Sequence, residues 1–289
     1  MKKLSHYLFL FFLSANAYAD TKLSPAWSSS AEFKNPESVI YDPVTKHLFV
    51  SNVNGEPLAA DGNGFISQMS PEGVMAKSKW LVGLDAPKGL ALKGNLLYVS
   101  DIDQLVVIDI EQERIIKRYA AENAKFLNDV AVDHQGNVYV SDMLTNRIYR
   151  LANDELTVWV DDDMLNSPNG LLVEHGKLVV ASWGKMTDGF ATDVPGHLLA
   201  IDLVTKQLQD LGDGKPVGNL DGIEADGLGN YLVTDWYNGR LLQITAEGKS
   251  TTLVEFNQGS ADHTVMPEKN LVIVPLMLDN TVVAFRISH

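Results

Sequence analysis

The sequence contains no cysteine, so no disulfide, thiolate ligand or cysteine nucleophile can contribute to its fold or chemistry. A chain of 289 residues is long enough to bury a core by packing alone. Basic residues are also scarce: 23 Lys and Arg stand against 37 Asp and Glu, a formal net charge of −14. A field of that sign repels phosphate backbones, so we expect no nucleic-acid partner.

Long apolar runs are missing beyond the N-terminus. The unbroken run Tyr7–Leu13 follows two lysines and precedes Ala17-Tyr18-Ala19, which is the pattern of a secretory signal peptide. The run is too short to be a membrane anchor, because a spanning helix needs about 20 apolar residues. The sequence therefore predicts a signal peptide at residues 1–19 and a single mature domain at residues 20–289. We expect a periplasmic or secreted protein with no membrane association after cleavage.

What the sequence does have is a repeat. Phe126–Asp142 reads FLNDVAVDHQGNVYVSD, and Asn219–Asp235 reads NLDGIEADGLGNYLVTD. Four more segments follow the same pattern: Pro36–Asn52, Pro87–Asp101, Pro168–Trp183 and the degenerate Ala261–Pro275. One polar residue, here called the anchor, opens each copy: Glu37, Lys88, Asn128, Asn169, Asp221 and His263. The anchors are 51, 40, 41, 52 and 42 residues apart, and the long gaps contain the Gly-rich insertions Asn52–Gly64 and Trp183–Gly196.

Each repeat predicts strands rather than helices. In the third copy, apolar and polar residues alternate over Val138–Asp142, Arg147–Leu151 and Leu156–Val160 after the short apolar segment Asp129–Asp133. Four short antiparallel strands per 40–50 residues are the signature of a propeller blade. We therefore predict an all-β, six-bladed β-propeller. The sixth copy lacks a fourth strand, so an N-terminal strand around Ala26–Phe33 should join the last blade and close the ring.

The anchors have two interpretations. For any one copy, Asn-Gly or Asp-Gly is explained by turn chemistry, since such pairs favour tight turns. Taken together, the six anchors each precede the innermost strand and should converge on one mouth of the central channel. Turn chemistry would not select Glu37 or Lys88. Carboxylate and carboxamide oxygens favour hard cations such as Ca²⁺ or Mg²⁺.

The repeats resemble the senescence marker protein, gluconolactonase and luciferin-regenerating-enzyme family of six-bladed propellers. The resemblance covers the whole mature chain, one repeat to one blade. It rests on four motifs: Glu37-Ser38-Val39-Ile40-Tyr41-Asp42, Asn128-Asp129-Val130-Ala131-Val132-Asp133, Ser167-Pro168-Asn169-Gly170-Leu171 and Leu220-Asp221-Gly222-Ile223-Glu224-Ala225-Asp226. The usual Gly-Pro after the first Glu is absent.

The resemblance implies a site and a reaction. Glu37, Asn169 and Asp221 correspond to the family's metal ligands, and Asn128 to a neighbour that contacts substrate. The implied cofactor is one divalent cation, with Ca²⁺ as the first choice and Mg²⁺, Mn²⁺ or Zn²⁺ as alternatives. The metal polarises a lactone carbonyl while a carboxylate, here Asp221, accepts a proton from the attacking water.

Two anchors leave alternatives open. Lys88 could extend into the mouth in place of a metal, orient Glu37 or Asp221 by pairing with them, or extend outward. His263 could carry a proton near neutral pH or be a hydrogen-bonded structural histidine. The family's substrate-binding Arg before Asn128 is not evident, because Lys125 is the only basic neighbour. The substrate therefore does not carry over.

The ends of the second strands should form an outer ring around the same mouth. From this ring and the residues that follow it, we select Trp183, Asp235 and Trp236 as substrate-binding candidates, together with the anchors Asn128, Lys88 and His263. Met186, Phe190 and Tyr237 are further aromatic or sulfur side chains that could line a pocket. The alternative is that the aromatic residues only cover the apolar ends of blades.

Two classes of function remain. The first is an exported, metal-dependent hydrolase of a lactone or related small ester. The second is a non-catalytic propeller, similar to the NHL type, that binds a small ligand or a protein partner. Propellers support many functions, so the fold alone does not decide. The oxygen ligands among the anchors favour the enzyme, whereas Lys88 favours the binding protein.

Overall fold

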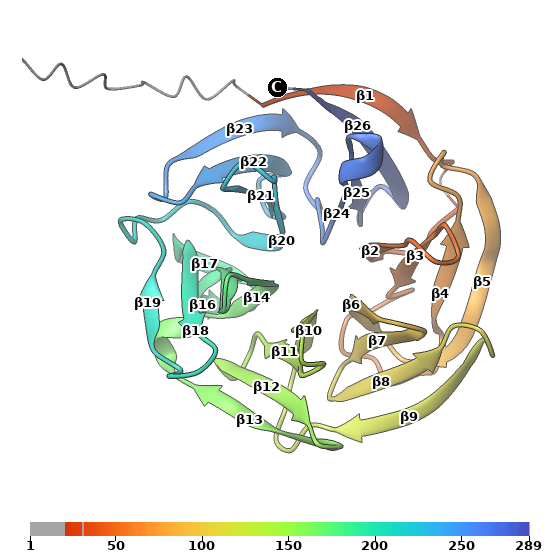
Figure 1. The fold of residues 1–289 in the computed structure, drawn as a ribbon, viewed down its shortest axis with the longest axis horizontal. Helices are drawn as coiled ribbons and strands as arrows, with labels where there is room; N and C mark the ends of the chain where they lie inside the picture. The colour runs from red at the N-terminus through yellow and green to blue at the C-terminus, as the bar shows by residue number, and fades with distance from the viewer. Residues whose placement is uncertain (1–20, 31, 289) are drawn as a thin grey trace, which may run out of the picture.

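The computed structural model describes residues 21–30 and 32–288 (Figure 1). Within them the chain forms six four-stranded antiparallel sheets around a central channel, which confirms the predicted six-bladed propeller. The helical segments of these residues are two turns of 3₁₀-helix, η1 (Asp163–Leu165) and η2 (Pro267–Lys269). No helix among the described residues is long and apolar enough to cross a membrane. The predicted signal peptide lies outside the described residues.

The blades follow chain order, with each innermost strand first. Blade 1 contains β2 (Pro36–Asp42), β3 (His47–Asn52), β4 (Gly64–Met69) and β5 (Met75–Leu84), and blade 2 contains β6 (Pro87–Lys93), β7 (Leu96–Asp101), β8 (Gln104–Asp109) and β9 (Arg114–Ala120). Blade 3 contains β10 (Leu127–Val132), β11 (Val138–Asp142), β12 (Arg147–Ala152) and β13 (Glu155–Asp161), and blade 4 contains β14 (Pro168–Glu174), β15 (Lys177–Ser182), β18 (Leu198–Asp202) and β19 (Leu208–Asp210). Blade 5 contains β20 (Leu220–Ala225), β21 (Asn230–Asp235), β22 (Arg240–Thr245) and β23 (Ser250–Glu255), and blade 6 contains β24 (Thr264–Met266), β25 (Leu271–Leu276), β26 (Thr281–Ser288) and β1.

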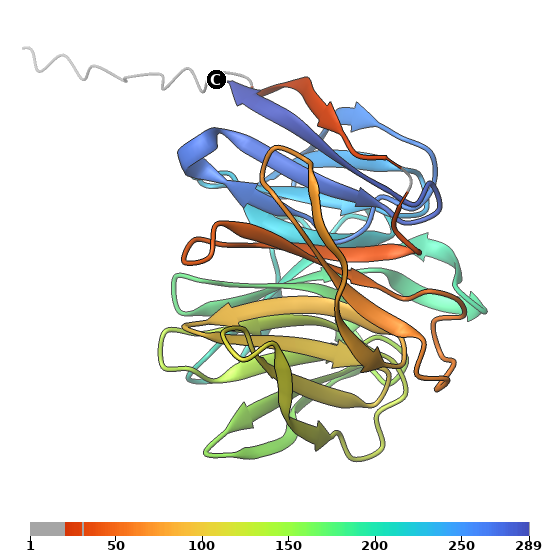
Figure 2. The ribbon, with the colours of Figure 1, turned by 90° about the vertical axis from the view of Figure 1, so that its right-hand side faces the viewer.

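The ring closes with strands from both ends of the chain (Figures 1 and 2). Strand β1 (Lys22–Ser28) pairs antiparallel with β26 and completes blade 6, as predicted. The predicted bounds, Ala26–Phe33, were wrong, because Phe33 is fully buried in the core between blades 6 and 1. At the channel, the Asp262 amide donates to the Glu37 carbonyl at 2.9 Å and joins the last blade to the first.

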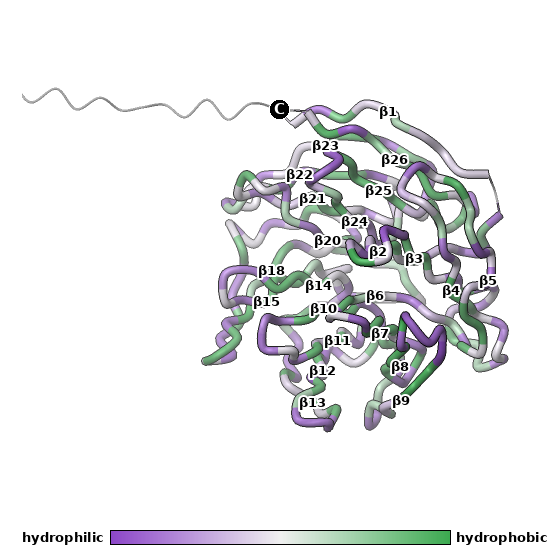
Figure 3. The backbone as a smooth tube through the Cα atoms, turned by 45° about the vertical axis from the view of Figure 1, so that its right-hand side comes forward, coloured by the Kyte–Doolittle hydropathy of each residue, from purple (hydrophilic) through white to green (hydrophobic). Residues whose placement is uncertain are grey.

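The core is divided among the interfaces between blades. Six clusters of buried apolar side chains each join two neighbouring blades, such as Phe49 and Ile66 of blade 1 with Leu97 and Val99 of blade 2. Second strands such as β7 are therefore buried on both faces. In the outer strand β9, by contrast, partly buried residues are interspersed with exposed ones. Apolar stretches of the chain accordingly lie in the strands (Figure 3).

Candidate active site

A cavity of about 350 Å³ lies at one mouth of the channel and receives residues from every blade. Five of the six anchors line it: Glu37, Lys88, Asn128, Asn169 and Asp221. Both insertions also reach it. The first contributes Val53, Gly55, Glu56 and Pro57, and the second, which folds into the hairpin β16 (Gly184–Asp188) and β17 (Ala191–Pro195), contributes Phe190.

A β-bulge orients each of these five anchors. The register of the two inner strands shifts between Pro36 and Val39 in blade 1, and at the equivalent positions of blades 2 to 5. A bulge interrupts the ladder and redirects a side chain, which is why bulges recur beside functional sites. The anchors thus leave the regular alternation of their strands and face a common cavity.

Hydroxyl groups of the second strands fix the bulges. In blade 3 the Ser141 hydroxyl accepts from the Asp129 amide at 2.9 Å and donates to the Asn169 carbonyl at 2.8 Å. Thr234 accepts from Gly222 in blade 5 in the same way. Ser141 and Thr234 each precede the final Asp of their strand. This repeated Ser/Thr-Asp pair could have indicated the support from the sequence, but it was not used for a prediction.

The glycine after the anchor in blades 4 and 5 allows neighbouring strands to approach closely and does not form a turn. Asn169-Gly170 and Asp221-Gly222 lie inside β14 and β20, not in turns, so the turn interpretation was wrong for these copies. A Cβ atom added to Gly170 would lie 1.9 Å from the carbonyl oxygen of Asp221. These glycines are required because neighbouring innermost strands approach closely around the channel.

The three predicted metal ligands share one property. Glu37 Oε2, Asn169 Oδ1 and Asp221 Oδ1 are each buried without a hydrogen-bond partner. Burial, followed by the charge of Asp221, raises the pKa of Glu37 well above its usual range, and burial and the charge of Asp262 do the same for Asp221. Buried polar atoms without partners are costly, and three oxygens on one cavity are a donor set that a hard cation would satisfy.

The fit depends on the carboxamide. Within residues 21–30 and 32–288 no group of three or more His, Cys, Asp and Glu side chains is arranged to hold a metal ion. Glu37 and Asp221 supply only two carboxylates, so Asn169 must complete the protein ligands. Water molecules complete such a shell in many Ca²⁺ and Mg²⁺ sites. The residues present therefore fit the divalent cation that the sequence predicts.

Lys88 extends into the cavity and not outward. Its side chain is buried, and its ammonium donates to the carbonyl oxygens of Ala86 at 2.9 Å and Pro57 at 3.0 Å. The ammonium also lies 4.6 Å from the centre of the Phe126 ring. It forms no ion pair with Glu37 or Asp221 in the described chain, although burial lowers its pKa to about 8 and the charge of Glu37 opposes that shift.

Asp235 does not line the cavity. Its fully buried carboxylate accepts from the Asn219 amide and pairs with Arg240. Asp142 and Asp101 accept backbone amides at the equivalent positions of their blades. These three aspartates of the outer ring thus accept backbone amides at the entry to their innermost strands, and this is where the structure places Asp235.

Aromatic and sulfur-containing side chains form one wall of the cavity. Trp183 and Trp236 line it, as predicted, with ring centres 5.8 Å apart. Phe126 and Met143 also line the cavity and pack against Trp183. Neither was predicted from the sequence, where Phe126 lies two residues before Asn128 and Met143 directly follows Asp142. Met186 borders a different cavity, and Tyr237 is exposed.

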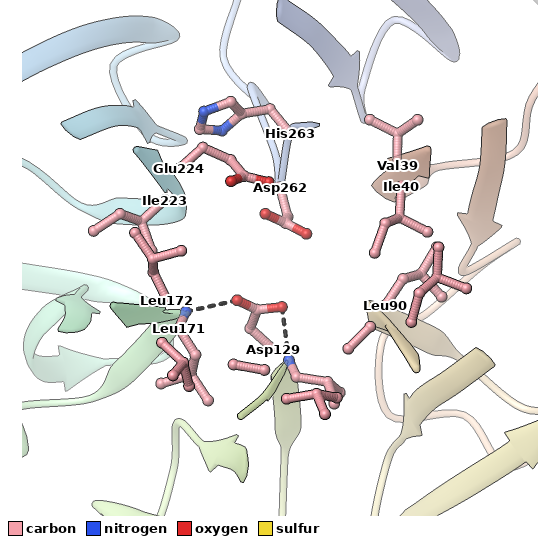
Figure 4. A pocket seen from close by; sticks show the side chains of 16 residues that line it. Val39, Ile40, Leu90, Asp129, Leu171, Leu172, Ile223, Glu224, Asp262 and His263 are labelled. Carbon is pink, nitrogen blue, oxygen red and sulfur yellow. Dashed lines mark hydrogen bonds between the residues drawn. The ribbon is translucent and has the colours of Figure 1, made fainter. Parts of the chain in front are cut away.

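His263 borders a second cavity, inside the channel, instead of the mouth. The innermost strands of the propeller line this cavity, and Asp129, Glu224 and Asp262 reach it (Figure 4). The carboxylates of Asp129 and Asp262 point toward the centre of the channel (Figure 4), and Asp129 accepts from the amides of Val130 and Leu171. Burial lowers the pKa of His263 to about 3, which favours the neutral imidazole near pH 7. Neither ring nitrogen has a hydrogen-bond partner among the described residues, so the alternative of a hydrogen-bonded structural histidine was wrong.

The channel carboxyls make stability depend on pH. Burial raises the pKa of Glu224 to about 8 and that of Asp262 to about 7. The folded protein therefore holds more protons than the unfolded chain between about pH 4 and pH 8, so the free energy of unfolding falls as pH rises. We expect urea unfolding of chelator-treated protein to show a loss of about 1 kcal/mol or more from pH 5.5 to pH 8.5.

The matched variants for this prediction are Glu224→Gln and Glu155→Gln. Glutamine cannot lose a proton, so Glu224→Gln should remove much of the pH dependence, and at pH 8.5 it should be more stable than the wild type. Glu155 is exposed on β13, and its replacement should leave the pH dependence unchanged. An unchanged slope in Glu224→Gln would show that Glu224 does not contribute to the pH dependence.

The fold and the mouth define a class: a six-bladed propeller with buried, unpaired side-chain oxygens at one end of its channel. Residues 36–264 match the sequence profile of the SMP-30/Gluconolactonase/LRE-like region. The chain belongs to this family, as its repeats predicted. Among curated proteins, none matches the sequence significantly.

Solved structures share the fold at low sequence identity. A gluconolactonase from Xanthomonas campestris is 14% identical, with a TM-score of 0.68 over 93% of this chain and 90% of that chain. A protein described as a candidate gluconolactonase is 16% identical, with a TM-score of 0.69 over 94% and 93%. A streptogramin B lyase is 12% identical, with a TM-score of 0.65 over 93% and 98%. Proteins named for a hydrolase and for a lyase both share this fold, so the reaction must be argued from the site.

Proposed function

We propose that the protein is a metal-dependent hydrolase of a lactone or related small ester. One observation carries the proposal: Glu37, Asn169 and Asp221 each hold a buried oxygen without a partner on a single cavity. A hydrolase of this kind is the simplest use of such a donor set beside an apolar wall. When bound, a divalent cation would supply a Lewis acid that polarises the substrate carbonyl.

The chain's own residues supply the rest of the reaction. The Asp221 carboxylate accepts a proton from the water whose oxygen attacks the lactone carbonyl carbon. The bond between that carbon and the ring oxygen then breaks, and the ring oxygen takes up the proton that Asp221 had accepted. Lactone and water thus give one hydroxy acid. Asn128 lies on the same cavity and orients the substrate by hydrogen bonding, while the aromatic wall excludes water.

Export belongs to the same proposal. It rests on the sequence pattern of residues 1–19 and on the absence of cysteine. Asp20 would become the N-terminus of a periplasmic or secreted enzyme. Its substrate would then be a small molecule that reaches this compartment.

A lactone assay tests the proposed function. Purified protein is treated with chelator and supplied separately with Ca²⁺, Mg²⁺, Mn²⁺ or Zn²⁺, and acid release from δ-valerolactone is followed by pH-stat. We expect hydrolysis that is lost on chelation and restored by at least one cation. Absence of hydrolysis of every simple lactone and ester with all four cations would contradict the proposal.

Lys88 supports a second candidate function. A buried ammonium near Glu37 offsets negative charge without a metal, as in a propeller that binds a ligand without catalysis. This alternative predicts that chelator changes neither stability nor ligand binding.

A further inference from the structure

Apart from the three candidate ligands, most of the side chains that line the cavity are apolar, and we call them the apolar wall. It is formed by side chains from the insertions, from the ends of second strands and from blade 6: Val53, Pro57, Phe126, Met143, Trp183, Phe190, Trp236, Met277 and Leu278. The ring centres of Phe126 and Phe190 are 5.6 Å apart, and those of Trp183 and Phe190 are 6.3 Å apart. With the contact between Trp183 and Trp236, these contacts join the four aromatic side chains of the wall into one cluster.

Several of the polar hydrogens on this wall are already engaged. The Trp183 indole N–H donates to the Phe190 carbonyl at 2.9 Å. Two donors of the Lys88 ammonium are taken by Pro57 and Ala86. A hydroxyl group placed against the wall would leave water and gain few partners in return, which is unfavourable.

We propose that the substrate carries an alkyl or aryl substituent on its lactone ring and is not a polyhydroxylated sugar lactone. This inference rests on the proposed function and specifies its substrate class. The carbonyl lies toward Glu37, Asn169 and Asp221, and the substituent packs on Phe190 and Trp236. An apolar group gains stabilisation from that contact in proportion to the area it buries.

Phe190 is the side chain that most directly sets this preference. It lies in the turn between β16 and β17, and 40% of its surface is exposed although it contacts two other rings. The insertion of blade 4 therefore holds an aromatic ring at the open edge of the cavity. A long substituent can leave the cavity past this edge and still contact the ring.

A matched set of six-membered lactones tests the proposal: δ-decalactone, δ-valerolactone and δ-gluconolactone. We expect kcat/KM for δ-decalactone to exceed that for δ-gluconolactone by at least about 100-fold, since a single methylene in an apolar pocket contributes about tenfold or more. Equal or faster hydrolysis of δ-gluconolactone would overturn the proposal.

Three variants locate the effect. Phe190→Ala and Trp236→Ala should raise KM for δ-decalactone about tenfold or more relative to the change that each causes in KM for δ-valerolactone, which carries no substituent. Tyr237→Ala is the matched control, because Tyr237 is exposed beside Trp236 and does not line the cavity. The same loss in Tyr237→Ala, or no loss in the first two variants, would count against the assignment.

Binding separates this inference from the proposed function. Trp183 and Trp236 line the cavity, so intrinsic fluorescence reports on an occupant. If the protein hydrolyses no lactone, the proposed function fails, but quenching by δ-decalactone at lower concentration than by δ-gluconolactone still supports the apolar site. No quenching by δ-decalactone, or stronger quenching by δ-gluconolactone, overturns the inference whether or not hydrolysis occurs.

Discussion

Asp221→Asn should lower kcat/KM for lactone hydrolysis by at least about 10³-fold, because general-base catalysis contributes about 10² to 10⁴. The substitution also removes the charge of one candidate metal ligand. The amide has nearly the same shape as the carboxylate, so the cavity keeps its form. Because burial raises the pKa of Asp221, the neutral amide costs less to bury, and the thermal midpoint of the chelator-treated protein should stay unchanged or rise.

The control for this variant lies on the same strand. Glu224 is also in β20, but it borders the cavity inside the channel and not the one at the mouth. Glu224→Gln should therefore retain activity within about threefold at saturating cation, since an effect of that size is below what a general base contributes. More than a tenth of wild-type activity in Asp221→Asn would rule out this residue as the base.

Gly170→Ala should cause the largest loss of stability. The added Cβ atom would lie 1.9 Å from the Asp221 carbonyl oxygen and 3.2 Å from the Ile223 side chain. The first of these atoms belongs to the backbone, so relief requires β14 and β20 to separate. Overpacking of this kind costs about 3 kcal/mol or more, and activity should fall with it because Asn169 and Asp221 lie at the same contact.

Gly94→Ala separates crowding from backbone strain. Gly94 has a φ of +59°, but no atom lies within 4 Å of an added Cβ. An alanine there costs only the conformational penalty, about 1 kcal/mol. Urea unfolding of both variants gives the comparison. If Gly170→Ala loses no more stability than Gly94→Ala, the close approach of the innermost strands does not constrain the site.

The repeat was sufficient to predict the fold. A period near 40 residues with alternating apolar positions leaves few alternatives to a propeller, and the missing fourth strand of the last copy predicts closure by the N-terminus. The bounds of that strand were harder to predict. Both β1 and the residues after it contain large apolar side chains, such as Trp27 and Phe33, so the sequence does not show where the strand ends. Only the packing of the assembled ring places Phe33 in the core and Trp27 on the outer strand.

The mouth could be predicted in part. Glu37, Asn169 and Asp221 share a position in the repeat, so the geometry of the propeller brings them to one cavity. Asp235 also shares a repeat position, but repetition does not distinguish a side chain that faces a cavity from one that holds a backbone amide. His263 faces the channel interior because it lies two residues beyond the anchor position of blade 6: Ser260 pairs with Leu276 as Pro36 pairs with Asn52, so Ala261 stands where the other blades have their anchor.

The apolar wall could be predicted only in part. Trp183, Phe190 and Trp236 were suggested by their place near the second-strand ends and in an insertion. Phe126, Met143 and Met277 come from three different strand ends and were not selected. Their contacts depend on how blades 3, 4 and 6 are placed around the ring. A periodic pattern describes what the blades have in common, whereas this wall consists of the residues in which they differ.

The number of divalent cations bound by the purified protein tests the central claim most directly. We expect one equivalent by elemental analysis after equilibration with Ca²⁺, and about 2.7 kcal/mol of added stability at a hundredfold excess over the dissociation constant. Glu37→Gln should lose both. No bound cation and no stabilisation by Ca²⁺, Mg²⁺, Mn²⁺ or Zn²⁺ would contradict the account and leave Lys88 as the positive charge of the site.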